Sequence, residues 1–285
     1  MEIKPTVRVA LAALVAMILV EAAVLAYVVN DRSSISDQLG SETQRAEMAS
    51  ALVNVSAALQ NELSAIDRST SACAMELKGK DLNGTGARDA LQSVVNDSSY
   101  VYNVITVDTN GTVMAVQPAI YSHLEGRNVS STDPVRQVLE DGRPIISGLF
   151  EVLDGYEAVI VAYPTLDGQG RVNGAVSTMF RPAEMMQNIT RMIDGGRVGS
   201  MVMQGDGVLL YDPDGSQVGK NTFTDPIYQD FTEIKRVAYR MINESSGSDS
   251  YSFKQTGADV HKDVMWTTVV VLGIRWTVAV NMVSL

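Results

Sequence analysis

The longest apolar run in the chain lies at its N-terminus. Residues 7–29 contain only two charged side chains, Arg8 and Glu21, and about 21 helical residues at 1.5 Å each would cross the roughly 30 Å core of a bilayer. The run is longer than the apolar region of a cleavable signal peptide, which predicts an uncleaved signal anchor. Because Lys4 and Arg8 precede the span, the positive-inside rule predicts a single-pass protein with a cytoplasmic N-terminus.

Glu21 lies well inside this predicted span, where a carboxyl group is costly. Two interpretations stay open. Either the side chain contacts a partner transmembrane helix, or it is a protonated acid that a weakly constrained anchor tolerates.

A helical period follows the anchor. Apolar residues such as Leu52, Leu59, Leu63 and Ile66 recur at helical spacings, and polar residues occupy the other face. This pattern is typical of an amphipathic helix with one buried side. We predict a long stalk helix over residues 31–79, which either pairs with a second copy in a homodimer or packs along its own domain.

After Gly79 the pattern changes to β-rich runs separated by turn residues, such as the hairpin signal Asn110-Gly111. A helix over 133–140 interrupts the first group of strands, and a helix over 183–193 links it to a second group. We therefore predict an α+β fold with two tandem antiparallel-sheet modules. The predicted strands cover residues 100–107, 112–116, 145–152, 157–163, 172–180, 198–203, 208–211, 250–255, 264–272 and 276–282.

The two modules share a sequence pattern. The first contains VDTNGTVMAV and then GRNVSSTDPV, and the second contains MQGDGVLLYD and then GKNTFTDPI. Thr-Asp-Pro suits the start of a helix, because Thr or Asp caps the first turn and Pro fits within it. The pattern predicts two copies of one α+β unit, with equivalent helices starting in 126–135 and 219–227. The predicted parts are a cytoplasmic tip and anchor (1–30), the stalk helix (31–79), a first module (80–181), a linking helix (182–196) and a second module (197–285), with residues 31–285 extracytoplasmic.

Composition narrows the function. The chain has 33 acidic and 22 basic residues, a net charge of −11 and no basic run, which argues against nucleic-acid binding. One cysteine and two histidines argue against a disulfide framework, a cysteine-based zinc site and a histidine-built catalytic centre. The sequence also lacks phosphate-loop, zinc-protease and nucleophile-elbow motifs. We expect no enzymatic activity, no cofactor and no metal.

Asn-x-Ser/Thr sequons are unusually frequent, and such acceptors are meaningful on surfaces exposed to a glycosylation system. They predict a cell-surface glycoprotein. The seven sequons begin at Asn54, Asn83, Asn96, Asn110, Asn128, Asn188 and Asn243.

The stretch GRNVSSTDPVRQVLEDGRPIISGLFEVLDGYEAVIVAYPTLDGQGRVNGAVSTMFRP, with the long helix and the repeated pattern around it, resembles the double Cache sensor family. These are PAS-like extracytoplasmic ligand-binding domains of histidine kinases and chemoreceptors, and the resemblance is to methanogenic archaeal members. It covers residues 33–285. The resemblance implies that the first module is membrane-distal and holds a small ligand between its sheet and the covering loop-helix layer, and that the second module is membrane-proximal.

The chain departs from the amino-acid-binding subgroup of that family in two places. The Arg-x-Trp-Tyr cluster of the covering helix is replaced by Asp133-Pro134-Val135-Arg136, and the acid near the last strand by Met179. We therefore expect a ligand other than a standard amino acid.

Two arginines offer bidentate partners for a carboxylate ligand, Arg127 and Arg136. Residues expected to line the same concavity are Tyr121, His123, Asp133, Ser147, Tyr156 and Tyr163. Structural alternatives stay open: Arg127 would only bridge surface acids, His123 would be a solvated loop residue, and Tyr163 would only pack before Pro164.

Taken together, these patterns predict a membrane-anchored extracytoplasmic sensor that captures a small molecule, such as a carboxylate, in the distal module. We expect no output domain of the protein's own, and we therefore expect the signal to pass to a partner such as a membrane kinase or chemoreceptor. The alternative is a structural or adhesive cell-surface glycoprotein that uses the same fold without a small ligand. An exported enzyme is a third hypothesis, and it would need clustered acids or a metal in a cleft.

Overall fold

The computed structural model describes residues 5–152, 155–194, 198–255 and 258–284, and for residues 5–37, 194 and 255 it describes the backbone alone. The chain divides into two units, residues 1–47 with 284–285, and residues 48–283. Within the described residues, no helix has an apolar stretch long enough to cross a membrane. The span predicted over residues 7–29, with Glu21, falls where side chains lie outside the described part, so it stays a prediction.

A single long helix, α1 (Pro5–Glu76), begins in the first unit and ends in the second, which confirms the predicted long N-terminal helix. In the second unit one face of α1 is completely buried. Val55, Leu59, Leu63 and Ile66 have no exposed surface, and their spacing of three or four residues places them on one side of the helix. This apolar side enters the core that both sheets share.

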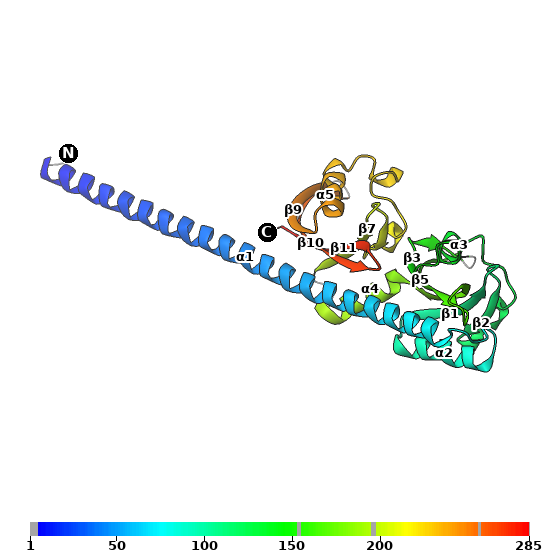
Figure 1. Cartoon of the computed structure of the whole chain (residues 1–285). Coiled ribbons are helices and arrows are strands. Elements are labelled where there is room, and N and C mark those ends of the chain that lie inside the picture. The colour runs from blue at the N-terminus through cyan, green and yellow to red at the C-terminus, as the bar shows by residue number, and fades with distance from the viewer. Residues whose placement is uncertain (1–4, 153–154, 195–197, 256–257, 285) are drawn as a thin grey trace. The chain divides into compact units, whose positions relative to one another are not determined.

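The first sheet has the order β2-β1-β6-β5-β3, with β4 added to β5, and all its pairings are antiparallel. Helices cover both faces (Figure 1): Val104 and Val176 pack with α2, whereas Ile105 and Ile160 pack with α3. Alternation along each strand therefore decides which layer a side chain joins. The strands are β1 (Val101–Asp108), β2 (Val113–Gln117), β3 (Ile145–Ile146), β4 (Phe150–Glu151), β5 (Glu157–Leu166) and β6 (Val172–Phe180), and the helices are α2 (Thr85–Asp97), the 3₁₀ helix η1 (Ala119–Leu124) and α3 (Asp133–Asp141).

The second sheet has the order β8-β7-β11-β10-β9 and is also antiparallel. Met203 and Trp266 pack with α5 on one face, while Val278 and Trp276 join the shared core on the other. The predicted α+β class with two antiparallel sheets is confirmed. The elements are α4 (Pro182–Asp194), β7 (Gly199–Gln204), β8 (Leu209–Tyr211), the 3₁₀ turns η2 (Gly215–Gln217) and η3 (Pro226–Tyr228), α5 (Thr232–Asn243), β9 (Ser246–Gln255), β10 (Ala258–Val271) and β11 (Ile274–Val283).

Two differences from the predictions lie in the first sheet and its cover. The pattern after Gly79 predicts strands and turns, but α2 forms there and buries Ala87, Leu91 and Val94 on one side. The strand predicted over 145–152 is instead two short strands. The Ser147 hydroxyl accepts the Ile160 N–H at 3.0 Å, so a side chain interrupts the ladder between them.

A third difference concerns the helix predicted to begin within 219–227. Asp225 caps only a 3₁₀ turn there, because its carboxylate accepts the Ile227 N–H at 3.0 Å. The α-helix starts at Thr232, one turn later.

The repeated sequence pattern corresponds to a repeated set of hydrogen bonds. The side-chain amide of Asn128 donates to the Asn110 carbonyl at 2.8 Å, and that of Asn221 donates to the Asp206 carbonyl at 2.8 Å. Each side-chain oxygen then accepts an N–H two residues on, at 3.0 Å in the first sheet and 2.9 Å in the second. The asparagines thus hold the loop that follows each hairpin against the hairpin turn.

Asn221→Ala should lower the free energy of unfolding by about 1–2 kcal/mol, because it removes these backbone contacts. Asn128→Ala should have a similar effect, and urea unfolding of the two variants measures it. The control is Asn54→Ala, an exposed position on α1. Equal stability of all three variants would show that the Asn128 and Asn221 side chains do not hold the loops.

Candidate functional site

Three tyrosines from separate elements meet on the α3 side of the first sheet. Tyr102 lies near the start of β1, Tyr121 in η1 and Tyr156 just before β5. The ring centroids of Tyr102 lie 5.2 Å from Tyr121 and 5.1 Å from Tyr156, in tilted arrangements. The register of β1 against β6 shifts between Val101 and Asn103, and such a bulge re-aims the side chain at that point. We call these three residues the tyrosine cluster.

Arg181 covers the tyrosine cluster. It directly follows β6, and its guanidinium carbon lies 4.9 Å from the ring centroid of Tyr156 and 5.9 Å from that of Tyr102. A cation over an aromatic face contributes about 0.5–1 kcal/mol at an exposed site. The guanidinium also pairs with Glu184 at 3.2 Å, and 38% of the Arg181 side chain is exposed. The Arg181 side chain is therefore held in place by Glu184 and the tyrosine rings, while part of it faces solvent.

Met179 lies beside the cluster, two residues before Arg181 on β6. The side-chain amide of Asn103 points at its sulfur from 3.8 Å and the Tyr156 hydroxyl from 3.9 Å. A thioether is polarizable but uncharged. The Met179 side chain therefore places no charge beside the cluster.

A cavity of about 380 Å³ opens next to the cluster, between the start of β1 and α4. Tyr102 and Arg181 belong to both the cluster and the cavity wall, and Tyr100, Glu184 and Asn188 are among the other lining residues. This volume lies at the lower end of the range for small-ligand sites, about 300–1,000 Å³. Arg191 is a second arginine in the cavity wall. The site can therefore surround a small molecule with aromatic faces and two cations, one of which, Arg181, is paired with Glu184.

The residue after Tyr156 connects this site to the second sheet. The Glu157 carboxylate lies so close to Gly219 that a β-carbon on that glycine would come within 1.7 Å of it. Burial, and next the charge of Glu151, raise the pKa of Glu157, while Lys220 opposes the shift. A second contact lies nearby, where the Leu149 N–H donates to the Gln204 side chain at 2.8 Å.

The structure brings together three of the predicted site residues. Tyr121 and Tyr156 are in the tyrosine cluster, and the His123 ring lies 6.4 Å from that of Tyr121, on an exposed position at the edge. Tyr102 and Arg181 also belong to the site, although the sequence pattern does not predict them. Their only sequence signal is that each flanks a strand of the sheet, Tyr102 near the start of β1 and Arg181 after the end of β6.

The predicted arginines do not join this group. Arg136 lies on α3 and pairs with Asp133 at 2.7 Å and Glu140 at 3.5 Å, all three being largely exposed. Arg127 is exposed in the loop before α3. Asp133 and Arg136 thus neutralise each other at the helix surface.

Ser147 and Tyr163 also lie elsewhere. The Ser147 hydroxyl is buried and donates to the Gly148 carbonyl at 2.7 Å. Tyr163 lies on the α1 side of the sheet, where its hydroxyl donates to the Asp67 carboxylate at 2.6 Å. Burial, and next this hydrogen bond, raise the pKa of Tyr163 to about 12. Both side chains therefore have partners within the fold itself.

Metal ligands do not gather in the part of the chain that the structure describes: no group of three or more histidine, cysteine, aspartate or glutamate side chains is placed to hold an ion.

The family model described as the sensor domain of histidine-kinase, guanylate-cyclase and chemotaxis-like proteins (HK/GC/Chemotaxis protein-like, sensor domain) matches residues 61–182. The matched segment runs from α1 to the start of α4 and contains the first sheet, the tyrosine cluster and Arg181. No curated protein sequence matches the chain.

Solved structures share the fold over most of this chain. An extracellular ligand-binding receptor from Desulfohalobium retbaense DSM5692 has a TM-score of 0.67 and 25% identity, covering 81% of this chain and 39% of its own. The ligand-binding domain of the Pseudomonas aeruginosa PAO1 amino acid chemoreceptor PctB, in complex with L-Gln, has a TM-score of 0.61 and 17% identity, covering 83% and 89%. The extracellular domain of the histidine kinase described as rpHK1S-Z16 has a TM-score of 0.63 and 15% identity, covering 84% and 94%.

The fold is thus that of the Cache-type ligand-binding sensor domains of chemoreceptors and histidine kinases. The resemblance seen in the sequence is confirmed at that level. The chain spans well under half of the length of the Desulfohalobium receptor.

Tyr163→Phe should lower the free energy of unfolding by about 1 kcal/mol near neutral pH, because it removes the hydrogen bond to Asp67. Because the pKa of Tyr163 is raised, the stability that its hydroxyl contributes depends on pH. Stability from the hydroxyl is present below about pH 10 and is lost as pH rises toward 12, so the difference between wild type and variant should shrink over that window. Urea unfolding at several pH values measures it.

The control for this variant is Tyr239→Phe, at a side chain that is 65% exposed on α5. We expect it to leave stability unchanged. A Tyr163→Phe variant as stable as this control would contradict a structural role for the Tyr163 hydroxyl.

Proposed function

We propose that the chain is a membrane-anchored extracytoplasmic sensor that captures a small molecule at the tyrosine cluster and passes the signal to a partner protein, such as a membrane kinase or chemoreceptor. The observation that carries this proposal is the Arg181 guanidinium over Tyr102 and Tyr156 at the wall of the cavity. The family model and the similar sensor structures support the sensor role. In this proposal residues 80–181 form the membrane-distal module, 197–285 the membrane-proximal module, and 1–30 the tip and anchor.

The chemistry of the site favours a carboxylate ligand. A guanidinium binds a carboxylate through two parallel hydrogen bonds, and tyrosine rings supply flat apolar surface with polar tips. The ligand of PctB, L-Gln, carries an amine as well as a carboxylate. In this chain the uncharged Met179 lies next to the cluster, so we propose an organic acid without an amine. The sequons support exposure of residues 31–285 outside the cell, and archaeal origin and glycosylation belong to the same proposal.

Thermal unfolding of the full chain, in the presence of small mono- and dicarboxylates, tests this proposal. A ligand at 100 times its dissociation constant should add about 2.7 kcal/mol of stability and raise the Tm. Arg181→Ala should abolish the shift, whereas Arg136→Ala, a matched arginine on the surface of α3, should retain it.

Either of two results would overturn the carboxylate proposal: a folded wild type that no acid stabilises, or an Arg181→Ala variant that keeps the full shift. The first result would favour a structural or adhesive glycoprotein with this fold.

Met179→Glu should change the ligand class. The new carboxylate would lie beside Asn103 and Tyr156, where it would repel an acid and attract an ammonium group, and charge-assisted hydrogen bonds are among the strongest available. We expect at least about a tenfold loss of carboxylate affinity, or 1.4 kcal/mol, with a gain for amines, by titration calorimetry. Met75→Glu, at a side chain that is 70% exposed on α1, is the control and should change neither affinity.

A further inference from the structure

The second sheet ends in a long strand with one free edge. β9 is the last strand in the order of the sheet and pairs along its length with β10. The residues Ser248, Ser250 and Ser252 occupy every second position, so their backbone N–H and C=O groups point in one direction, away from β10. Such a row of unpaired groups is a template on which another strand can add.

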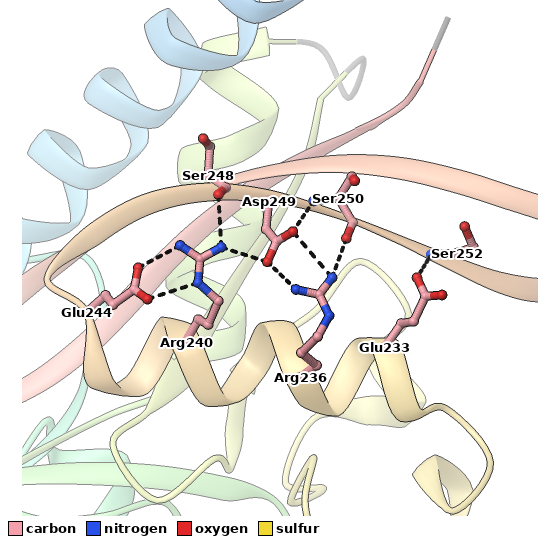
Figure 2. Close-up of polar contacts among 8 residues, drawn as sticks. All are labelled: Glu233, Arg236, Arg240, Glu244, Ser248, Asp249, Ser250 and Ser252. Atoms are coloured by element: carbon pink, nitrogen blue, oxygen red, sulfur yellow. Dashed lines mark hydrogen bonds and ion pairs between the residues drawn. The ribbon is translucent and has the colours of Figure 1, made fainter.

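Side chains from one face of α5 already bind this edge, as Figure 2 shows. Arg240 donates to the Ser248 carbonyl at 3.3 Å, Arg236 donates to the Ser250 carbonyl at 2.8 Å, and Glu233 accepts the Ser252 N–H at 2.7 Å. The spacing of three and four residues aligns the three side chains with alternate positions of the strand.

Asp249 ties the two arginines together. Its carboxylate accepts from Arg236, from Arg240 at 2.7 Å, and from the Ser250 N–H at 2.8 Å (Figure 2). The Arg236 guanidinium, with Arg240 and the Ser250 N–H, holds the pKa of Asp249 at about 2. Arg240 is further held by two bonds to Glu244, both at 2.9 Å. Four backbone groups of the free edge are thus bound by side chains in one ionised network.

We propose that this network, Glu233, Arg236, Arg240 and Asp249, is an edge guard: it occupies the positions at which a further β-strand would bind, and the strand that it keeps out is β9 of a second copy of this chain. Charged side chains at a sheet edge are an established means of preventing such pairing. In this chain the charges do more than border the edge, because they bind its backbone groups directly.

The sequence of β9 identifies the second copy as the excluded strand. Antiparallel pairing of two copies centred on Ser250 would place Ser248 opposite Ser252 and Asp249 opposite Tyr251. The same register places Ser246 opposite Lys254. No like charges face each other in this arrangement, and the outward backbone groups of the two strands match. The edge is therefore complementary to itself once α5 releases it.

The double variant Glu233→Ala/Arg236→Ala opens the centre of the edge, because it frees the Ser250 carbonyl and the Ser252 N–H without changing the net charge. It leaves Arg240 in place, whose guanidinium lies 5.1 Å from the ring of Trp266. Ser250→Cys in the full chain reports the pairing, because opposed residues in a hydrogen-bonded pair have Cα atoms about 5.5 Å apart, within disulfide range. The native Cys73 is buried, with 4% exposed. We expect the opened variant to form a disulfide-linked dimer through the reporter thiols at least about tenfold faster than the reporter alone, a change that corresponds to 1.4 kcal/mol.

The matched control is Asp133→Ala/Arg136→Ala with the same reporter, which removes an exposed ion pair at the same three-residue spacing from α3. It should cross-link no faster than the reporter alone. The proposal is overturned if the opened variant keeps its native circular dichroism and does not cross-link, if the control cross-links equally fast, or if the reporter thiol cross-links to foreign proteins instead.

Hydrogen exchange at Ser252 tests the same contact in a single variant, so it applies even if the double variant fails to fold. Glu233→Ala alone leaves both arginines in place and frees the Ser252 N–H. In the monomer, exchange at Ser252 should rise about tenfold, because a hydrogen bond to a charged group contributes roughly 1.5 kcal/mol. Unchanged exchange at Ser252 would show that α5 does not close the edge.

Discussion

The structure depends on one apolar face of α1. Val55, Leu59, Leu63 and Ile66 are completely buried, and each such side chain contributes about 1.5–3 kcal/mol when it leaves water. The same core contains Phe180 from the first sheet and Trp276 from the second, with their rings 6.3 Å apart. A sheet with one uncovered apolar face is not stable by itself. The helix therefore supplies the layer that both sheets need, and it joins them into one unit.

The parts of the fold that could be predicted are those in which one pattern repeats for long enough. The helix over 31–79 and the strands around Val104, Val161 and Val176 have clear periods, and the structure follows them. α2 has a regular face too, but it covers only Thr85–Asp97 between glycines and polar residues. The break at Ser147 is a tertiary effect, because it depends on a hydroxyl meeting the N–H of Ile160 on the neighbouring strand.

The candidate site also combines features that local sequence patterns predict with features that depend on tertiary structure. Arg136 has acids three residues before and four residues after it, at Asp133 and Glu140, and helical spacing alone predicts that these acids neutralise it. Arg181 shows no comparable pattern in the sequence. Its position over Tyr156 results from the end of β6 and the register of the sheet, which bring together residues 25 positions apart. The sequence therefore indicates the fold of ligand-binding sensor domains, but it does not indicate that Arg181 lies over the tyrosine cluster.

The two sheets repeat one backbone arrangement with different chemistry, and the link between them begins at the site. The hydrogen bonds of Asn128 and Asn221 are equivalent. The Glu157 carboxylate lies against Gly219, whereas a β-carbon on the corresponding Gly126 would meet no atom within 4 Å. Gly219 has a φ of +78° and has no room for a side chain there, so this contact requires glycine for two separate reasons. Because Glu157 directly follows Tyr156, one peptide bond and one close contact connect the tyrosine cluster to the second sheet.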